Sequence, residues 1–197
     1  MNCRFCKTTL QHELINLGNA PASNSFLTAD QLNRPEVYYP LKVFVCHKCF
    51  LVQIDEYQSS ASIFNDEYVY FSSYSTSWLN HARQYTEMMT QRFALGTESS
   101  VMEIASNDGY LLQYFAEKNI PVTGIEPTKN TAEVALGKGI PTIVDFFGTR
   151  LAAQLVMEDK QADLLVGNNV LAHVPDIVDF VAGMKIVLKP GGIITLE

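Results

Sequence analysis

The chain has 197 residues, of which 47% are hydrophobic and 18% are charged, so its length suits one or two domains around a well-buried core. Its net charge of -7 offers little attraction to nucleic acid or to an anionic membrane surface, which argues against a polynucleotide-binding protein. No apolar segment approaches the roughly 20 residues of a membrane helix, and cysteines and polar residues stand where a signal peptide would be apolar, so we expect a cytoplasmic protein without membrane or nucleic-acid partners.

Four cysteines form two C-x-x-C pairs, Cys3 with Cys6 and Cys46 with Cys49. Two residues between cysteines let both thiolates turn toward one ion, and two such pairs complete a tetrahedron around a structural zinc ion. Two alternatives remain open. Structural disulfides are disfavoured by a reducing cytosol, and a redox pair lacks the βαβ pattern that should precede it. His47 lies inside the second pair and is expected to be a spectator, because four thiolates already satisfy the ion.

The segments that flank the second cysteine pair, 40–45 and 50–54, are predicted to be strands of a zinc-stabilised hairpin lobe spanning residues 1–57. Residues 57–77 are rich in serine and tyrosine, which is typical of a loop. A helix is predicted next, with Ser77 as its N-cap and His81 on its solvent side. Its apolar stripe consists of Trp78, Leu79, Ala82, Tyr85, Met89 and Phe93. Residues 58–97 are thus expected to connect the lobe to a second domain.

From residue 98 onward, strands and helices alternate as in a parallel sheet that is covered on both faces. The predicted strands are 101–105, 122–126, 142–144, 164–167 and 193–197, and the predicted helices are 110–118, 129–136, 149–156 and 177–188. This α/β pattern predicts a doubly wound sheet, whose ligand binds beyond the carboxyl ends of the strands. Polar residues fall at that edge in four places: 106–109, 126, 145–146 and 168–173.

The turn after the first of these strands is the strongest cofactor signal. It leads from a strand that contains Glu103 into a helix, whose N-terminus offers free backbone N–H groups to an anion. Glu126 ends the next strand and is placed to accept hydrogen bonds from ribose hydroxyls. Gly109 is the only glycine of the turn, so the dinucleotide fingerprint is absent. S-adenosylmethionine (SAM) is therefore favoured over a dinucleotide as the cofactor, which disfavours an oxidoreductase. Ala105 and Asn107 replace the usual glycines; an alanine fits at position 105 if its φ is negative, and Asn107 tolerates left-handed backbone better than most residues.

Further residues complete the expected cofactor site. Asp145 follows the third strand and could accept from the adenine amino group, with Phe146 against the ring; alternatively, Asp145 caps a helix and Phe146 belongs to the core. Asn168 follows the fourth strand at the same edge. A structural alternative is also open, in which Glu103 and Asp108 only mark a helix entry and Glu126 is a solvated strand end. The expected cofactor-binding set is Glu103, Ala105, Asn107, Gly109, Glu126, Asp145, Phe146 and Asn168.

Four segments of the second half resemble class I SAM-dependent methyltransferases: 103–112, 124–127, 169–174 and 188–192. Together with the cysteine pairs, residues 21–24 and the loop 68–73, they make the whole chain similar to the sugar C-methyltransferases of deoxysugar biosynthesis. The resemblance implies a zinc-binding β lobe and a Rossmann-like SAM domain over 98–197, acting on a nucleotide-linked ketosugar such as a dTDP sugar. It covers only the first half of such an enzyme. We therefore expect a fragment whose sheet is truncated after the fifth strand, with an exposed edge that favours self-association.

The resemblance also implies that His173 and Tyr70 border the sugar, with Tyr68 as the alternative tyrosine. Carbon methylation beside a ketone requires a base and a donor to the enolate, and a histidine titrates near the working pH. The alternatives are a helix-entry role for His173 and aromatic packing for Tyr70. A different function is open as well: a zinc-ribbon interaction module joined to a methyltransferase-like domain without activity, which the degenerate turn at Ala105 and Asn107 would favour.

Overall fold

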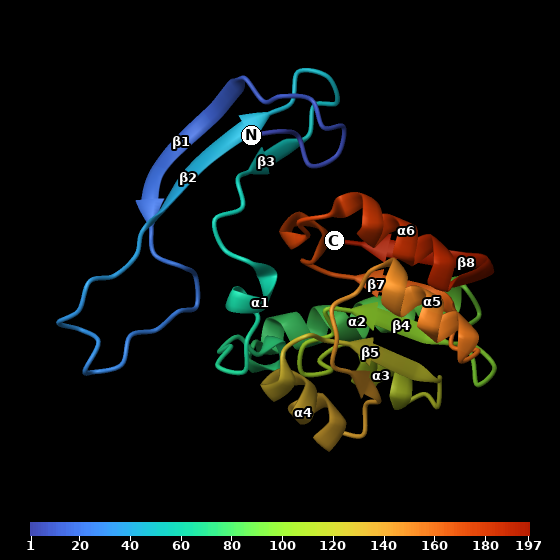
Figure 1. Ribbon diagram of the computed structural model, residues 1–197. Helices are drawn as coiled ribbons and strands as arrows, with labels where there is room; N and C mark the ends of the chain where they lie inside the picture. The colour runs from blue at the N-terminus through green and yellow to red at the C-terminus, as the bar shows by residue number, and fades with distance from the viewer. The chain divides into compact units, whose positions relative to one another are not determined.

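The computed structural model describes all 197 residues, which divide into two compact units. The first unit comprises residues 1–64 and 175–177, and the second comprises residues 65–174 and 178–197. Figure 1 shows residues 1–64 of the first unit in blue to teal, and most of the second unit in green to red. None of the helices has both the length and the apolar character that a membrane span requires.

The first unit contains a three-stranded antiparallel sheet in the order β1-β2-β3. Its elements are β1 (His12–Ala20), β2 (Tyr39–Val45), β3 (Val52–Ile54) and the short helix α1 (Ser60–Ile63). The predicted pairing of β2 with β3 around the second cysteine pair is present. The buried core of this unit is small and is built on Cys3, Leu10 and Cys46. Cysteines therefore supply much of the interior that a lobe of this size would otherwise lack.

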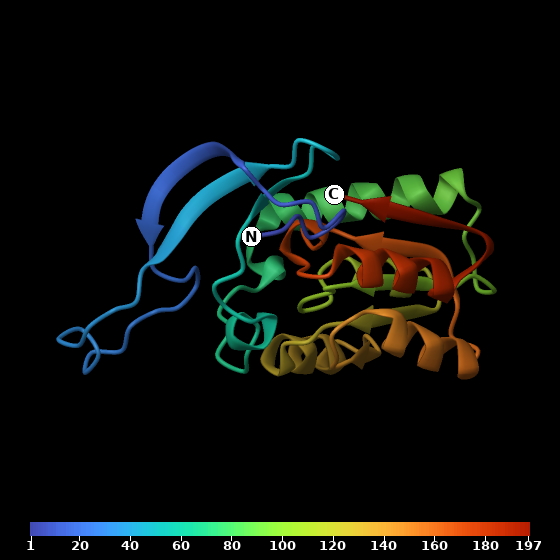
Figure 2. The same ribbon diagram turned by 45° about the horizontal axis from the view of Figure 1, so that its top comes forward.

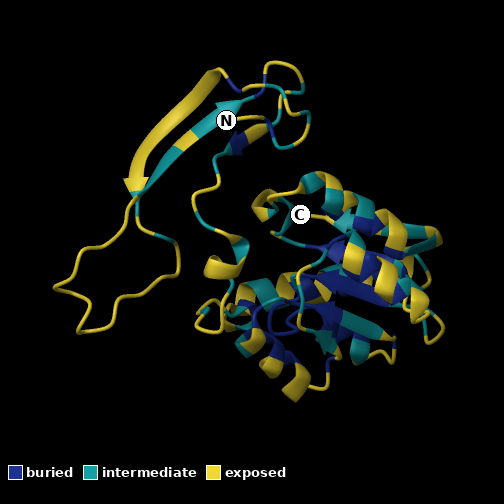
Figure 3. Cartoon of the chain, viewed as in Figure 1, coloured by how far each residue is buried: buried dark blue, intermediate teal, exposed yellow.

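Strand β1 was not predicted. Almost all its residues are exposed, as the yellow arrow in Figure 3 shows, so it has no alternation of buried and exposed positions to find in the sequence. Its register with β2 shifts twice, and Gly18 within it has a φ of 81°. Pairing with β2, rather than burial of one face, makes this segment a strand.

The second unit begins with a loop that includes the 3-10 turn η1 (Ser72–Tyr74) and leads into helix α2 (Thr76–Arg92). The N-cap is Ser75, whose side chain accepts the backbone N–H of Trp78 over 3.3 Å, so the predicted cap at Ser77 was wrong by two positions. The apolar stripe of this helix packs into the core as predicted. His81 is exposed and stacks on Trp78 with a centroid distance of 5.0 Å.

The remainder of the second unit is the predicted parallel sheet, with strand order β6-β5-β4-β7-β8 (Figure 1). Its strands are β4 (Val101–Ile104), β5 (Val122–Ile125), β6 (Thr142–Ile143), β7 (Ala162–Gly167) and β8 (Leu188–Leu196). Its helices are α3 (Leu112–Ala116), α4 (Lys129–Gly137), α5 (Thr149–Met157), the 3-10 turn η2 (Leu171–His173) and α6 (Ile177–Val187). Helix α3 is shorter than predicted, and β8 begins at Leu188, before the glycine pair rather than after it.

Two apolar layers enclose this sheet. Val101, Leu164 and Val166 pack on the face that carries α2 and α3, and Met102 and Leu165 pack on the face that carries α5 and α6. Figure 2 shows green α2 along the sheet on the side away from orange α5. Because side chains alternate along a strand, the residue after Met102 points to the α2 and α3 face. That residue is Glu103, a carboxylate within an otherwise apolar layer.

Candidate functional site

The four cysteine sulfurs of the first unit lie within 4.8 Å of one another. The Sγ atoms of Cys3 and Cys49 are 3.6 Å apart, and those of Cys6 and Cys46 are 3.5 Å apart. A disulfide would require about 2.05 Å, and all four cysteines are free. Sulfurs bound at about 2.3 Å to a tetrahedral zinc ion would be separated by about 3.8 Å. The arrangement therefore fits a zinc ion and does not fit two disulfides.

The two cysteine pairs have the same backbone geometry. The N–H of Lys7 donates to the carbonyl of Cys3 over 2.9 Å, and the N–H of Phe50 donates to the carbonyl of Cys46 over 2.8 Å. Lys7 and Phe50, which follow the second cysteine of each pair, have φ values of 61° and 62°. These matching turns direct both thiols of a pair to the same side. The C-x-x-C spacing in the sequence therefore corresponds to one turn geometry that occurs in both pairs.

The four thiols lie close enough to shift one another's pKa values. Burial raises the pKa of Cys3, but hydrogen bonds, first among them that from the Gln53 amide at 3.3 Å, lower it to about 6. The N–H of Leu51 lowers the pKa of Cys49, whereas burial and the sulfurs of Cys6, Cys3 and Cys46 raise it to about 12. Four thiolates cannot share this volume without a positive charge among them. His47 lies outside the cluster, is exposed, and places its ring edge against His12 with centroids 5.7 Å apart.

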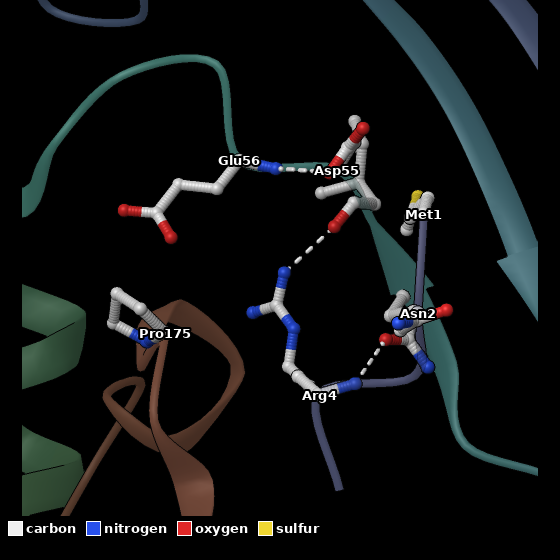
Figure 4. A pocket seen from close by; sticks show the side chains of 8 residues that line it. Met1, Asn2, Arg4, Asp55, Glu56 and Pro175 are labelled. Atoms are coloured by element: carbon white, nitrogen blue, oxygen red, sulfur yellow. Dashed lines mark hydrogen bonds between the residues drawn. The ribbon is translucent and has the colours of Figure 1, made fainter. Parts of the chain in front are cut away.

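The first unit also has a small hollow, shown in Figure 4. Its lining consists of Met1, Asn2, Arg4, Gln53, Ile54, Asp55, Glu56 and Pro175. Arg4 is already engaged, because its guanidinium donates to the Ile54 carbonyl over 2.7 Å and its backbone N–H donates to Gln53 over 2.9 Å. The volume of about 150 Å³ is below the roughly 300 Å³ at which ligand pockets begin. None of the predicted site residues lines this hollow.

In the second unit, the turn after β4 carries three left-handed positions, at every second residue. Ala105, Asn107 and Gly109 have φ values of 58°, 50° and 75°. The negative φ with which an alanine would fit without strain is thus not present at Ala105. The tight reversal at the strand end requires a left-handed residue there, as a glycine would provide, and an alanine in this conformation costs about 1–2 kcal/mol. The Ser106 N–H, which donates to the Ile125 carbonyl over 3.2 Å, helps to hold the turn in place.

Glu126 joins the ends of two neighbouring strands. One carboxylate oxygen accepts the N–H of Asn107 over 2.9 Å, and the other accepts both the N–H of Thr128, over 2.9 Å, and the Thr128 hydroxyl. Burial raises the pKa of Glu126 despite these donors. A carboxylate has about four lone-pair sites, so these three bonds leave capacity for a ribose hydroxyl. The alternative of a solvated strand end does not hold, because Glu126 is only 4% exposed.

Glu103 is fully buried, and neither of its carboxylate oxygens has a hydrogen-bond partner. Burial raises its pKa well above the usual range, and the carboxylates of Glu126 and Asp108 raise it further. The Tyr110 hydroxyl opposes this shift, although it lies outside hydrogen-bond geometry. Buried polar groups are nearly always paired in native proteins. An unpaired acid at the end of β4 therefore suits a ligand that brings a cation or a donor.

The hydroxyl-rich loop is attached to the turn after β4, residues 105–109, which is named the cofactor turn below after its predicted role. The Asn107 side-chain amide donates to the Tyr70 carbonyl over 3.1 Å, and its oxygen accepts the Ser72 N–H over 2.9 Å. Ser73 donates to the Asp108 carboxylate through its hydroxyl. The Tyr70 ring is half exposed. Burial, followed by the charge of Glu126 and then by Tyr70, raises the pKa of Tyr68. Both predicted tyrosines thus belong to a loop that borders the turn.

Asp145 and Phe146 lie just beyond β6. Asp145 accepts the Phe146 N–H over 2.8 Å and the Arg150 guanidinium over 2.6 Å, so both of its oxygens already have donors. Phe146 is 42% exposed and is not a core residue, unlike the alternative considered from the sequence. An aromatic ring that remains exposed next to an acid is consistent with an adenine site. Arg150 was not among the predicted site residues.

The residues after β7 take different positions. The Asn168 side chain donates to the Tyr110 hydroxyl over 3.1 Å, which places it next to the turn. His173 ends η2 and is exposed, and its side chain makes no hydrogen bond to the other predicted site residues. The structure therefore joins Asn107 to Glu126 by a hydrogen bond and brings Glu103 and Asn168 near Tyr110. It places His173 at the same edge of the sheet without linking it to them.

Two neighbours of the site were missed in the sequence. Tyr110 is 3% exposed, stacks on Trp78 and lies between Glu103 and Asn168. Thr128 is fully buried and precedes α4, but its hydroxyl donates to Glu126 rather than capping the helix. A threonine two positions after a strand-end acid was a usable signal, whereas the role of Tyr110 depends on packing with α2 and had none.

Comparison with known proteins supports this division of the chain. Residues 3–64 match a methyltransferase-associated family described as "putative zinc binding domain", and residues 102–196 match the family described as "methyltransferase domain". Residues 102–196 are thus similar to methyltransferase domains, and the five-stranded parallel sheet of the second unit is typical of class I methyltransferases. The predicted fold class, and the combination of a zinc-binding lobe with a SAM-dependent methyltransferase domain, are thereby confirmed.

Individual relatives agree with this assignment. The chain is 28% identical over 195 residues to the C-methyltransferase NovU of Streptomyces niveus, an alignment that covers 99% of this chain and 46% of that protein. The chain thus spans less than half the length of this relative.

Two solved structures share the fold of the methyltransferase domain. One, from Methanococcus maripaludis, is described as a putative S-adenosyl-L-methionine-dependent methyltransferase; its TM-score is 0.51 at 17% identity, over 61% of this chain and 57% of that one. The other, a SAM-dependent methyltransferase from Anabaena variabilis, has a TM-score of 0.50 at 19% identity, over 59% of this chain and 51% of that one.

Proposed function

We propose that this chain belongs to a SAM-dependent C-methyltransferase whose substrate is a nucleotide-linked ketosugar. The observation that carries the proposal is Glu103, a buried carboxylate without a partner at the end of β4 in a methyltransferase domain. The C-methyltransferase relative supports transfer to carbon. The sugar class rests on the resemblance of the domain combination to enzymes of deoxysugar biosynthesis.

The residues around the turn suit the parts of SAM. Glu103 would pair with the methionine ammonium, because that cation would satisfy the unpaired carboxylate. Glu126 would accept the ribose hydroxyls with its remaining lone pairs. Asp145 would meet the adenine amino group, with Phe146 beside the ring. The turn itself would be shaped by Ala105, Asn107 and Gly109. Asn168 would hold the Tyr110 side chain beside the bound cofactor through its hydrogen bond to the Tyr110 hydroxyl. Bound there, SAM supplies an electrophilic methyl group on a sulfonium.

Transfer to carbon requires more than cofactor binding. A base must take the C–H proton beside the ketone, since the new carbon–carbon bond uses the electron pair of that C–H bond while the methyl–sulfur pair returns to sulfur. His173 is exposed at the sheet edge and is available as the base or as a donor. The half-exposed Tyr70 would hold the sugar carbonyl through its hydroxyl. Zinc, held by the four cysteines, would be structural, because four thiolates leave no open coordination position.

The second candidate is a methyltransferase-like domain without activity. The left-handed Ala105 favours it, because a strained turn could weaken cofactor binding. To separate the two, the chain is incubated with methyl-labelled SAM and a panel of nucleotide-linked sugars, and the products are analysed by mass spectrometry. Label on a carbon of a ketosugar supports the first candidate. Cofactor binding without label on any sugar supports the second.

A further inference from the structure

The loop that carries Tyr68 and Tyr70 is attached to the cofactor turn at several points. Asn107 and Asp108 hold its second half through Tyr70, Ser72 and Ser73. Its first half is held from α4, where the Asn130 amide donates to the Tyr68 carbonyl over 2.6 Å. All these residues belong to the second unit. The loop is therefore attached to the same residues that form the cofactor turn.

The backbone and the side chain of Asn107 make hydrogen bonds to different parts of the structure. Its backbone N–H donates to Glu126 over 2.9 Å, inside the cofactor turn. Its side chain points to the loop, where the amide oxygen meets a backbone donor at Ser72 and the amide nitrogen meets a backbone acceptor at Tyr70. This orientation is fixed by its partners, because Ser72 offers only an N–H there and Tyr70 only a carbonyl.

These contacts are shielded from water. Ser72 is 6% exposed, Asn107 is 7% exposed and Asp108 is fully buried. A buried backbone group that loses its partner is left unsatisfied, at a greater cost than the loss of an exposed hydrogen bond. A glycine at position 107 would adopt the left-handed φ of 50° easily but would provide neither side-chain contact. Asparagine therefore adds an attachment that the usual glycine of such turns cannot provide.

We propose that Asn107 is a positioning residue that couples the cofactor turn to the substrate loop. Fixing the turn with cofactor fixes the backbone of Tyr70 and Ser72, and thereby the direction from which Tyr70 approaches a sugar. The inference deepens the proposed function and depends on it for the role of Tyr70. The attachment itself is independent of that role. We therefore expect the loop to be ordered through Asn107 in the free protein and to become more ordered when cofactor occupies the turn.

The test measures amide hydrogen exchange in the whole chain by NMR. The readout is the exchange rate of the Ser72 amide, and the variant is Asn107→Gly. This substitution keeps the left-handed backbone and removes both side-chain bonds. Asn119→Gly is the matched control, because Asn119 is also left-handed, with φ of 59°, but is exposed and distant in sequence from the loop. In the free protein we expect exchange at Ser72 to be about tenfold faster in Asn107→Gly and unchanged in Asn119→Gly. Equal exchange at Ser72 in all three proteins would overturn the attachment.

The coupling is tested with S-adenosylhomocysteine at saturating concentration, so that a change in affinity does not affect the result. Exchange at Ser72 should slow further in the unaltered protein but not in Asn107→Gly, whereas exchange at Gly109 should slow in both. Equal slowing at Ser72 in both proteins would overturn the coupling. If the unaltered protein bound no S-adenosylhomocysteine, the proposed function would fail, while the result in the free protein would still decide whether Asn107 holds the loop.

Discussion

The backbone N–H of Asn107 donates to the carboxylate of Glu126 over 2.9 Å, which ties the turn after β4 to the end of β5. The same carboxylate accepts from Thr128 at the start of α4. One buried acid thus fixes the relative positions of two parallel strands and a helix at the edge where ligands bind in such sheets. Its structural role and its proposed ribose-binding role share the same atoms.

This double role predicts the effect of Glu126→Gln. The amide can replace only one carboxylate oxygen as an acceptor, so one buried N–H loses its partner, and we expect a loss of about 1–3 kcal/mol in the free energy of unfolding. Affinity for S-adenosylhomocysteine should fall at least about tenfold. Denaturant unfolding and calorimetric titration measure these effects. Glu133→Gln is the control, because Glu133 is exposed and its ion pair with Lys129 spans 3.9 Å. Similar results for both variants would contradict the proposed role of Glu126.

The unpaired Glu103 predicts proton release on cofactor binding. Its pKa is raised in the free protein, chiefly by burial, which favours the protonated form of the carboxyl. A methionine ammonium beside it would favour the carboxylate and lower this pKa. Affinity should therefore rise with pH above the ordinary carboxyl value until the raised pKa is passed. Calorimetric titrations in buffers of different ionisation enthalpy should report a released proton, and Glu103→Gln should abolish it. Binding without proton release would rule out this pairing.

The left-handed Ala105 predicts that Ala105→Gly stabilises the protein. Relief of about 1–2 kcal/mol of backbone strain outweighs the extra flexibility that glycine gives the unfolded chain. The net gain should be up to about 1 kcal/mol, which corresponds to up to about 4 °C in Tm for a chain of this size. Ala135→Gly, at a buried position of α4, should instead lower stability by about 1 kcal/mol. A loss of stability in Ala105→Gly would show that the methyl group at position 105 is needed for packing.

The four-thiolate cluster predicts that Cys46→Ser loses zinc and unfolds the first unit. Cys46 is fully buried, and this unit has few other buried apolar residues. Structural zinc supplies most of the folding free energy of such lobes. Metal analysis of the purified protein and proteolysis within residues 1–64 measure the two effects. His47→Ala should retain the zinc, because His47 lies outside the cluster. A full zinc content in Cys46→Ser would contradict the proposed ligand set.

Local patterns made much of the fold predictable. The C-x-x-C spacing placed four sulfurs together, and the alternation of apolar strands with helices gave the parallel sheet and the edge at which Glu126 and Asp145 lie. Other features depend on partners distant in sequence. Strand β1 exists through pairing with β2, and the conformation of Ala105 is set by the reversal that joins β4 to the turn.

The same distinction applies to the site. Glu103 and Glu126 could be selected because each acid stands on or just beyond a strand of apolar residues. The contact of Asn107 with Tyr70 joins residues far apart in the chain and has no local pattern. The ion pair of Asp145 with Arg150 was accessible from the sequence, because an arginine in the first turn of a predicted helix can reach back to an acid just before it.

Calorimetric titration of the chain with S-adenosylhomocysteine is the most direct measurement of cofactor binding at the turn after β4, because this product keeps the ammonium, ribose and adenine contacts without turnover. We expect one site with a Kd in the micromolar range, about -8 kcal/mol or slightly weaker, and no binding by the double variant that combines Glu103→Gln with Glu126→Gln. Absence of binding to the folded, zinc-loaded chain would contradict the assignment of the turn after β4 as a SAM site.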